Sequence, residues 1–230
     1  SMEEQGKIGV VIAAAGSSGR MGGRDKLTEP MGGIPVILRT LAAVEAVPEV
    51  DEIVVVTRKD RVEEYRQLLG QCSRLLAVVP GGSTRQESVQ NGVRALSSDC
   101  RLAAIHDGAR PLVTPEVFAR CIEAARSCGA ATAAVPVKDT IKLADERGRV
   151  VDTPDRSRLW AVQTPQIFDR DEYLRAAAEA ERRGLFCTDD CQLFEAMGRE
   201  VQLVLGDYRN LKLTTPEDFL AAGAYLEGLK

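Results

Sequence analysis

Short apolar segments alternate with longer segments of helical periodicity along most of the chain. The apolar segments are rich in Val, Ile, Leu and Ala, and they cover residues 8–15, 53–57, 75–79, 102–106 and 130–135. In the stretches that follow them, apolar residues recur every three or four positions, as on one face of a helix. This alternation is typical of βαβ units, so it predicts an α/β fold with a mostly parallel sheet and helices on both faces.

Helix N-termini are marked by threonine at three positions. Thr84 lies three residues before Glu87, which is the spacing of a capping box, and a proline directly follows both Thr114 and Thr215. Threonine at the N-cap accepts a hydrogen bond from a free backbone N–H, and proline fits the first helical position. Toward the C-terminus the pattern predicts helices at residues 171–183, 189–197 and 216–226, with a strand at 201–205.

The alternation breaks between residues 137 and 168. Charged residues and two prolines, Pro154 and Pro165, interrupt the pattern there. The strand-like pieces that remain are short, at residues 140–143, 150–151 and 159–162. We interpret the segment as a β-hairpin or arm that projects from a single domain spanning residues 1–230.

The overall composition argues against several functional classes. Hydrophobic residues make up 44% of the chain and charged residues 28%, as in ordinary globular proteins. A net charge of -4 argues against a nucleic-acid-binding protein, which needs a basic face. The longest apolar runs are far shorter than the roughly 20 residues that cross a bilayer, so we expect no membrane span.

The N-terminal residues and the cysteines bear on the cellular compartment. Residues 1–5 contain no basic segment that leads into an apolar one, so we expect no secretory signal. Six cysteines are accompanied by only one histidine, which gives no convincing zinc set. We therefore expect the cysteines to be reduced and the protein to be cytoplasmic.

The first predicted strand leads into a loop of small residues that ends at Lys26. Small side chains and glycines let backbone N–H groups approach a phosphate or a base, and the carboxyl ends of parallel strands are where α/β sheets bind ligands. The glycines Gly16, Gly19 and Gly22 fit neither the G-x-G-x-x-G spacing nor a P-loop. The loop is a candidate nucleotide site, and a solvated turn is the alternative.

Charged residues after two of the strands are candidates for phosphate and metal binding. In the first loop, Arg20 and Lys26 could neutralise phosphate oxygens, which is the main demand of nucleotidyl transfer. After the fourth strand, Asp107 could bind Mg²⁺ together with triphosphate oxygens. The alternative is a turn in which Asp107 pairs with Arg110. We expect His106, which precedes this turn, to pack at the strand end rather than to act in catalysis.

A second glycine turn precedes the helix that Thr84 caps. Gly81 and Gly82 lie just before the cap, and Ser88 follows in the first turn of the helix. The N–H groups and the dipole of a helix N-terminus favour polar or anionic ligand atoms, so a base or ribose edge could lie here. A plain helix cap explains Thr84 and Glu87 but leaves the paired glycines and Ser88 unexplained.

Six motifs occur in order along nearly the whole chain. They read Ala-Ala-Gly-x-x-x-Arg-Met with a following lysine, Gly-Gly-x-x-Arg-x-x-Ser-Val, His-Asp-x-Ala-Arg-Pro, Pro-Val-x-Asp-Thr-Ile-Lys, Leu-Trp-x-x-Gln-Thr-Pro-Gln-x-Phe and Leu-Lys-x-Thr-x-Pro-Glu-Asp. Together, over roughly residues 8–219, they resemble the 2-C-methyl-D-erythritol 4-phosphate cytidylyltransferase family of the non-mevalonate isoprenoid pathway. Two loop positions depart from the common pattern, since Ser83 stands where some relatives have an acidic or amide residue and Gly108 replaces a common alanine.

The resemblance implies a fold, an assembly and a set of site residues. The fold would be a Rossmann-like nucleotidyltransferase, and the protein a Mg²⁺-dependent homodimer whose β-arm, at about residues 137–168, completes the neighbouring active site. The residues expected to contact CTP are Ala14, Ala15, Gly16, Gly82 and Ser88, and the catalytic cations are Arg20, Lys26 and Lys212. Those expected to bind the polyol phosphate are Asp107, Arg110, Thr140, Arg156, Thr164 and Lys212, with Thr140 and Arg156 supplied by the second subunit.

The implied reaction joins CTP to 2-C-methyl-D-erythritol 4-phosphate and releases pyrophosphate. A phosphate monoester is largely ionised at neutral pH, so its attack on the α-phosphorus needs no general base and no covalent intermediate. One alternative is a D-ribitol 5-phosphate cytidylyltransferase, which would differ only in the acceptor pocket. Another is a catalytically silent nucleotide-binding module, which would be expected to lose a phosphate-binding cation, whereas Arg20, Lys26 and Lys212 are all present.

Overall fold

The computed structural model describes residues 5–16, 20–21 and 24–228, and its centre is a seven-stranded sheet with the order β13-β9-β12-β8-β1-β6-β7. The strands are β1 (Lys7–Ala14), β6 (Glu52–Thr57), β7 (Leu75–Pro80), β8 (Cys100–Asp107), β9 (Ala130–Pro136), β12 (Trp160–Asp169) and β13 (Gln202–Leu205). Neighbouring strands are parallel except at β12, which runs antiparallel between β8 and β9. The prediction of a mostly parallel sheet is confirmed.

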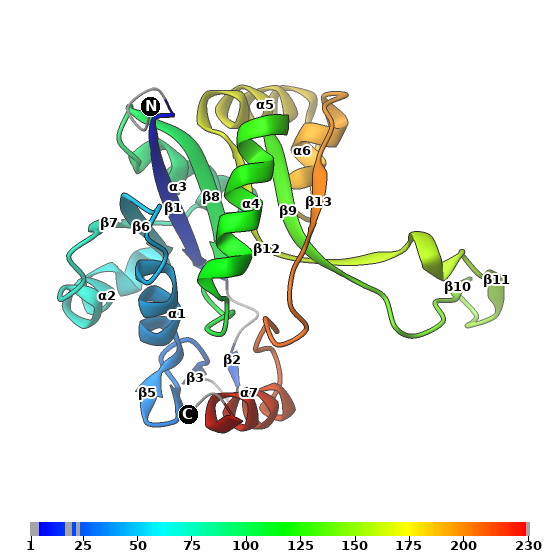
Figure 1. Ribbon diagram of the computed structural model, residues 1–230, viewed down its shortest axis with the longest axis horizontal. Coiled ribbons are helices and arrows are strands. Elements are labelled where there is room, and N and C mark those ends of the chain that lie inside the picture. The colour runs from blue at the N-terminus through cyan, green and yellow to red at the C-terminus, as the bar shows by residue number, and fades with distance from the viewer. Residues whose placement is uncertain (1–4, 17–19, 22–23, 229–230) are drawn as a thin grey trace.

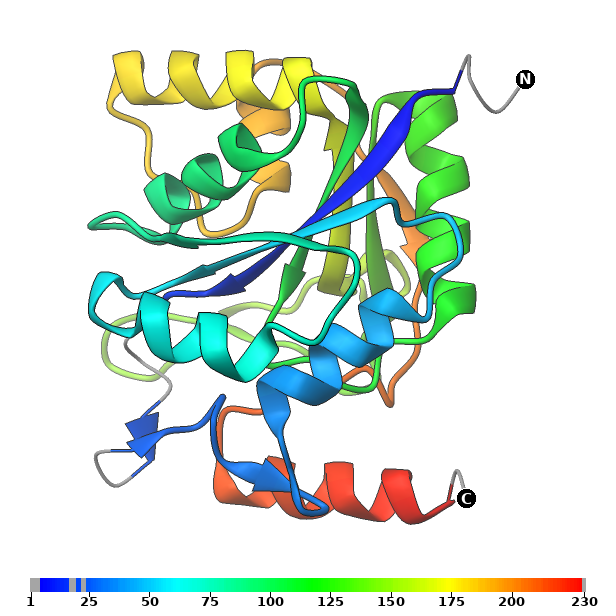
Figure 2. The ribbon, with the colours of Figure 1, turned by 90° about the vertical axis from the view of Figure 1, so that its left-hand side faces the viewer.

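Helices cover both faces of this sheet, as the sequence predicted (Figure 2). They are α1 (Val36–Glu45), α2 (Val62–Leu69), α3 (Arg85–Ala95), α4 (Pro115–Cys128), α5 (Arg170–Arg183), α6 (Cys191–Ala196) and α7 (Pro216–Gly228). Side chains of α1, α2 and α4 share one buried cluster, and those of α3, α5 and α6 share the other. Successive residues of β1 alternate between the clusters, since Ile12 belongs to the first and Val11 to the second.

The N-terminus of α3 and its contact with the sheet follow from particular residues. Thr84 accepts a hydrogen bond from the backbone N–H of Glu87 at 3.0 Å, as the capping-box spacing predicted. About two turns after this cap, the helix approaches the sheet closely at Gly92. A Cβ atom there would lie 2.4 Å from Val11 Cγ1 and 2.6 Å from Val56 Cγ2, so glycine sets the distance between helix and sheet.

The irregular segment differs from its predicted extent. We expected an arm up to residue 168, but residues 163–168 are buried in the central sheet as part of β12. A break in the pairing with β9 between Val162 and Gln166 accommodates Pro165, which has no N–H to donate. Between β9 and β12, the chain therefore lies outside the sheet only over residues 137–159.

Residues 137–159 form a small substructure beside the main body. Two short strands, β10 (Leu143–Ala144) and β11 (Val150–Asp152), pair antiparallel in a sheet of their own, and a 3-10 turn, η2 (Arg156–Arg158), follows them. The strand residues are exposed, including Leu143 and Val150. Figure 1 shows this segment extending away from the layered body.

Five short elements complete the secondary structure: β2 (Arg20–Met21), β3 (Arg24–Asp25), β4 (Pro30–Met31), β5 (Ile34–Pro35) and the 3-10 turn η1 (Lys59–Arg61). Every helix in the described ranges is too short or too polar to cross a membrane. All six cysteines are free thiols, as predicted.

Candidate functional site

A cleft of about 330 Å³ opens at the carboxyl ends of the parallel strands. Loops after β1, β7 and β8 form its walls, and Lys26 and Lys212 enter from two further segments. Backbone hydrogen bonds hold these strand ends together. Gly108 N donates to the carbonyl of Ala13 at 2.9 Å, and Gly81 N donates to that of Thr57 at 2.7 Å. The cleft therefore lies where ligands bind in open parallel sheets.

Most of the residues predicted to bind CTP or the phosphates line this cleft. They are Ala14, Ala15, Gly16, Lys26, Gly82, Ser88, Asp107 and Lys212. Arg20 belongs to β2, but its side chain lies outside the described part of the structure. Residues 17–19 and 22–23 of the predicted nucleotide loop are also outside the described residues.

The glycine turn before α3 is shaped by Ser88. Its Oγ accepts a hydrogen bond from Gly82 N at 3.0 Å and donates to the carbonyl of Thr84 at 2.9 Å. A Cβ atom on Gly81 would lie only 2.6 Å from Ser88 Oγ and 2.8 Å from the Cβ atom of Ala15. The paired glycines and the serine, which a plain cap leaves unexplained, thus let the turn fold onto the helix N-terminus beside the first loop.

Lys26 is a buried cation on the cleft wall, with only 7% of its surface exposed. Burial and the nearby charge of Lys212 lower its pKa below the ordinary lysine value, against the opposing effect of Asp107 and Asp25. Two lysines held close together in a partly dry cleft form a site for a strongly anionic ligand.

Asp25, next to Lys26, has a structural role in the described part of the chain. Its carboxylate accepts hydrogen bonds from Leu27 N at 2.9 Å, from Tyr65 at 3.1 Å and from Arg61. These contacts tie the end of β3 to α2. They fix the backbone from which Lys26 projects.

Asp107 and Arg110 pair within one turn, which the sequence offered as the alternative to a metal-binding Asp107. Arg110 Nε donates to Asp107 Oδ2 at 2.9 Å, and Arg110 Nη1 donates to the carbonyl of Asn210 at 2.8 Å. Asp107 nevertheless lines the cleft, so a local turn and a candidate ligand site coexist there, whereas Arg110 and Thr164 are not among the described residues that line it. Burial acts to raise the pKa of Asp107, but the charges of Arg110, Lys212 and Arg85 outweigh it and hold the pKa below its usual range.

The segment that carries Lys212 is attached to the same turn. Leu213 N donates to the carbonyl of Ala109 at 2.9 Å, and the carbonyl of Asn210 accepts from Arg110. These bonds lie on either side of Lys212. They place it on the same cleft as Lys26, although the two lysines are far apart in sequence.

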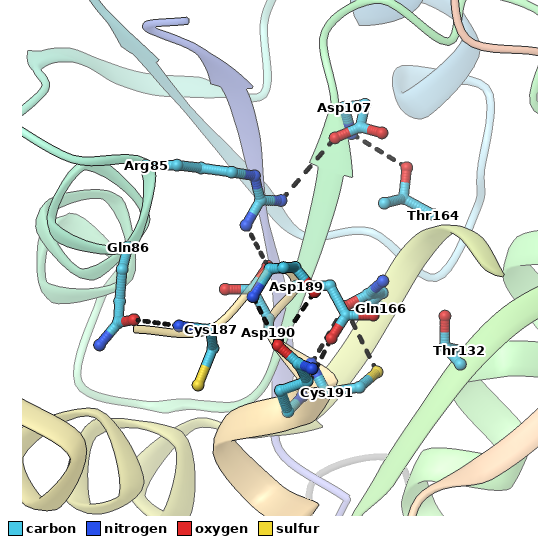
Figure 3. Close-up of polar contacts among 12 residues, drawn as sticks. Arg85, Gln86, Asp107, Thr132, Thr164, Gln166, Cys187, Asp189, Asp190 and Cys191 are labelled. Carbon is cyan, nitrogen blue, oxygen red and sulfur yellow. Dashed lines mark hydrogen bonds and ion pairs between the residues drawn. The ribbon is translucent and has the colours of Figure 1, made fainter. Parts of the chain in front are cut away.

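Arg85 also lines the cleft, although the sequence motifs assigned it no role. Its guanidinium lies 3.8 Å from Asp107 Oδ1 and 3.0 Å from Asp190, a buried residue that precedes α6. Figure 3 shows Arg85 pointing between these two carboxylates. The arginine of the Gly-Gly-x-x-Arg motif was the only signal in the sequence. Its ion pairs depend on long-range packing that the motif does not specify.

Thr164 and His106 form a buried hydrogen-bond chain behind the Asp107 turn. Asp107 N donates to Thr164 Oγ1 at 3.0 Å, and Thr164 Oγ1 lies 2.9 Å from His106 Nδ1. His106 Nε2 lies 3.0 Å from the carbonyl of Arg110. Burial lowers the pKa of His106 to about 4, so the ring is neutral at pH 7. His106 packs at the strand end as predicted, in ring contact with Phe118.

Two predicted substrate residues lie apart from the cleft in this chain. Thr140 and Arg156 are exposed on the segment that leaves the sheet, and Arg156 donates to the carbonyl of Lys138 at 2.7 Å. Neither is among the described residues that line the cleft. Any contact they make with this site requires a second chain or a movement of the segment.

The cleft fits a metal ion that is held mainly by substrate. No group of three or more His, Cys, Asp or Glu side chains that could bind a metal occurs in the described part of the chain. Asp107 Oδ1 faces the cleft and lies 3.8 Å from Arg85, beyond hydrogen-bond distance, whereas Asp107 Oδ2 accepts a hydrogen bond from Arg110. One free carboxylate oxygen suits Mg²⁺, which keeps several sites for phosphate and water.

Comparison with known proteins places the chain in a family. Residues 8–228 match the family described as 2-C-methyl-D-erythritol 4-phosphate cytidylyltransferase. A protein of that name from Desulforamulus reducens is 44% identical over 226 residues, which is 96% of this chain and 97% of the relative. Another from Caldanaerobacter subterraneus subsp. tengcongensis is 43% identical over 95% of this chain and 98% of its own length.

Solved structures agree with this assignment. The 4-diphosphocytidyl-2C-methyl-D-erythritol synthase from Anaerococcus prevotii superposes with a TM-score of 0.88 at 36% identity, covering 98% of both chains. The 2-C-methyl-D-erythritol 4-phosphate cytidylyltransferase from Thermus thermophilus superposes with a TM-score of 0.79 at 32% identity, covering 96% of this chain and 99% of its own. The chain belongs to the 2-C-methyl-D-erythritol 4-phosphate cytidylyltransferase family.

Proposed function

We propose that the protein transfers a cytidylyl group from CTP to 2-C-methyl-D-erythritol 4-phosphate. The products are 4-diphosphocytidyl-2-C-methyl-D-erythritol, an intermediate of non-mevalonate isoprenoid precursor synthesis, and pyrophosphate. One observation carries the proposal: Lys26, Lys212 and the capped N-terminus of α3 converge on a single cleft at the carboxyl ends of the strands. That arrangement offers two cations and free N–H groups to a triphosphate.

The nucleotide lies along the loops that are built from small residues. Ala14, Ala15 and Gly16 present backbone without bulky side chains, and Gly82 and Ser88 form the wall beside the helix N-terminus. Backbone groups there can bond to a base or ribose edge, while the triphosphate extends toward the lysines. This orientation places the α-phosphorus between the nucleotide loops and the Asp107 turn.

The acceptor phosphate attacks the α-phosphorus in line with the departing pyrophosphate. One acceptor oxygen forms a bond to the α-phosphorus, and the bond from that phosphorus to the bridging oxygen breaks, so that pyrophosphate leaves with the electron pair. Lys26 and Lys212 stabilise the charge that builds up on the phosphoryl oxygens, and Arg20 is assigned the same role from the family motif. The nearby histidine is neutral and buried, which agrees with a reaction that needs no general base.

Asp107 would hold Mg²⁺ through its Oδ1 side, and the ion would supply charge neutralisation for the leaving pyrophosphate. The protein's own part is to keep this oxygen free by engaging the other oxygen with Arg110. Asp107, Arg110 and Thr164 also belong to the acceptor side of the site. Six free cysteines are the state that a reducing cytoplasm maintains, which supports a cytoplasmic location.

The exposed segment at residues 137–159 supports a homodimeric site. Apolar side chains such as Leu143, Val150 and Val151 are more than half exposed on it, which is costly unless a partner covers them. In a two-fold dimer, this segment of one chain reaches the cleft of the other and supplies Thr140 and Arg156 to the acceptor.

The reaction is tested by ³¹P NMR of the purified protein with CTP, Mg²⁺ and 2-C-methyl-D-erythritol 4-phosphate. The expected result is loss of the triphosphate and monoester signals and growth of one diphosphate ester and one pyrophosphate signal in equal amounts. Orthophosphate release, or no change in the monoester signal, would refute the proposed transfer. Omitting the acceptor is the control, since the proposed reaction releases no pyrophosphate without it.

A further inference from the structure

The single histidine of the chain lies directly behind the acceptor side of the site. His106 is the penultimate residue of β8 and is completely buried. It contacts β12 through Thr164 and the end of the Asp107 turn through the carbonyl of Arg110. The proposed reaction gives this ring no chemical step, so its two buried hydrogen bonds need another explanation.

The chemistry of the two partners fixes the hydrogen-bond directions. The carbonyl of Arg110 can only accept, so His106 Nε2 carries the hydrogen and donates across 3.0 Å. Thr164 Oγ1 accepts from Asp107 N at 3.0 Å, which leaves its hydroxyl hydrogen to donate to His106 Nδ1 at 2.9 Å. The result is one chain from Asp107 N through Thr164 and the ring to the Arg110 carbonyl, with each bond defined in direction.

The turn between Asp107 and Arg110 is therefore held at both ends by buried groups. At its start Thr164 bonds the backbone N–H of Asp107, and at its end His106 bonds the carbonyl of Arg110. The Arg110 side chain is held separately by the carbonyl of Asn210, and Asn210 Nδ2 donates to the carbonyl of Thr164 at 2.8 Å. The backbone and the guanidinium of Arg110 are thus attached to the same buried network.

We infer that His106 is a positioning residue, which as the Nε2–H tautomer fixes the Asp107–Arg110 turn for the acceptor phosphate. The inference rests on the proposed function, because the turn matters for activity only if Asp107 and Arg110 bind the acceptor. Loss of the Nε2–H donor deprives the part-buried Arg110 carbonyl of its bond to His106 and frees the end of the turn. The base and ribose of CTP are proposed to bind on other loops, so CTP affinity should depend on this bond less than acceptor affinity does.

Two amide substitutions distinguish the role of His106 Nδ1 from that of His106 Nε2. The amide of His106→Asn lies near the Nδ1 position and keeps a partner for Thr164, but it does not reach the Arg110 carbonyl. The longer His106→Gln places an N–H near the Nε2 position and restores that donor. Phe118→Leu is the control for a merely structural effect, because it loosens packing against the ring without removing a hydrogen bond.

Steady-state kinetics with each substrate varied in turn test the positioning role. His106→Asn should raise KM for the acceptor about tenfold, as expected for a carbonyl that loses its donor, with a smaller change in KM for CTP. His106→Gln should return most of the acceptor affinity, and Phe118→Leu should change neither KM. An acceptor KM that is unchanged in His106→Asn, or that rises equally in Phe118→Leu, would overturn the role.

Direct observation of the ring tests the hydrogen-bond chain in the wild-type protein and does not depend on any variant folding. Because the chain has one histidine, ¹⁵N labelling of histidine gives a single pair of ring signals. We expect Nε2 protonated and Nδ1 unprotonated at neutral pH. The opposite tautomer would overturn the inference. A wild-type protein without cytidylyl transfer refutes the proposed function, whereas an active wild type with an unaffected His106→Asn variant refutes the positioning role alone.

Discussion

Replacing the buried Lys26 by methionine separates its electrostatic role from its packing role. The methionine side chain has nearly the same length and fills the same space, so the change removes a charge from a residue that is only 7% exposed. Removing one preorganised charge stabiliser from a water-poor site costs about 2.7–4 kcal/mol in the transition state, which lowers kcat by roughly 10² to 10³. KM for CTP should rise less, because in the proposed binding mode Lys212 and backbone N–H groups of the same cleft also contact the phosphates.

The free energy of unfolding of Lys26→Met should not fall together with its kcat. The lowered pKa of Lys26 means that the folded state disfavours its charge, through burial first and the nearby Lys212 second. At pH 7 the lysine is protonated in the unfolded chain, so folding opposes that charge and a neutral side chain removes the cost. We expect Lys26→Met to be at least as stable as the wild type in urea unfolding. A lower kcat would then not be explained by loss of fold.

The pH dependence of the wild type follows from the same pKa. In its proposed role Lys26 stabilises phosphates only while protonated, so kcat/KM for CTP should fall as pH rises through a pKa that lies below the ordinary lysine value. In Lys212→Met one cause of the lowered pKa is absent. The alkaline fall should therefore shift to higher pH, although the maximal rate is lower.

The assay is pyrophosphate release under saturating substrates, with the wild type and Lys7→Met as references. Lys7 pairs with Asp99 at the far end of β1, so its loss tests the removal of a lysine away from the cleft. A folded Lys26→Met protein whose kcat falls less than about tenfold would refute the assigned charge-stabilising role.

Three further changes test the nucleotide wall at Ser88, the packing of α3 on the sheet and the site shared between two chains. Ser88→Ala removes the acceptor of the Gly82 N–H and should raise KM for CTP about five- to tenfold with little change in kcat, as measured by initial rates; an altered acceptor KM instead would contradict the assignment. Gly92→Ala places a methyl group 2.4 Å from a valine of β1 and should lower the free energy of unfolding in urea by about 1–3 kcal/mol; unchanged stability would show that α3 shifts freely. Lys26→Met and Arg156→Ala, inactive alone, should recover about a quarter of wild-type activity after subunit exchange, because each mixed dimer has one intact site. No recovery would place Arg156 in the site of its own chain.

Local patterns in the sequence were sufficient to predict those strands and helix caps that depend on contacts between nearby residues. The apolar runs became strands, and Thr84 and Thr114 cap α3 and α4 through bonds to N–H groups three residues on. The loops after β1, β7 and β8 converge because the carboxyl ends of parallel strands share one edge of a sheet. That geometry was predictable without knowing which strands are neighbours.

The predicted arm was too long because strand pairing over large sequence distances leaves little local signal. Pro165 argued against a strand, yet β12 contains it, and buried pairing with β8 and β9 on either side outweighs the missing donor. The same limit applies to Arg85, whose contact with Asp190 spans 105 positions, and to Thr164 and His106, which are 58 apart. Periodicity and motif spacing cannot specify such contacts, which depend on the assembled sheet.

The proposed transfer of the cytidylyl group to 2-C-methyl-D-erythritol 4-phosphate is most directly tested by comparing two acceptors in the same assay. Pyrophosphate release is measured with CTP and Mg²⁺ at a range of concentrations of either 2-C-methyl-D-erythritol 4-phosphate or D-ribitol 5-phosphate. We expect a kcat/KM for the methylerythritol phosphate at least about 10² higher, since an acceptor that leaves buried polar groups unpaired is strongly rejected. Equal values, a preference for ribitol phosphate, or no release with either acceptor would contradict it.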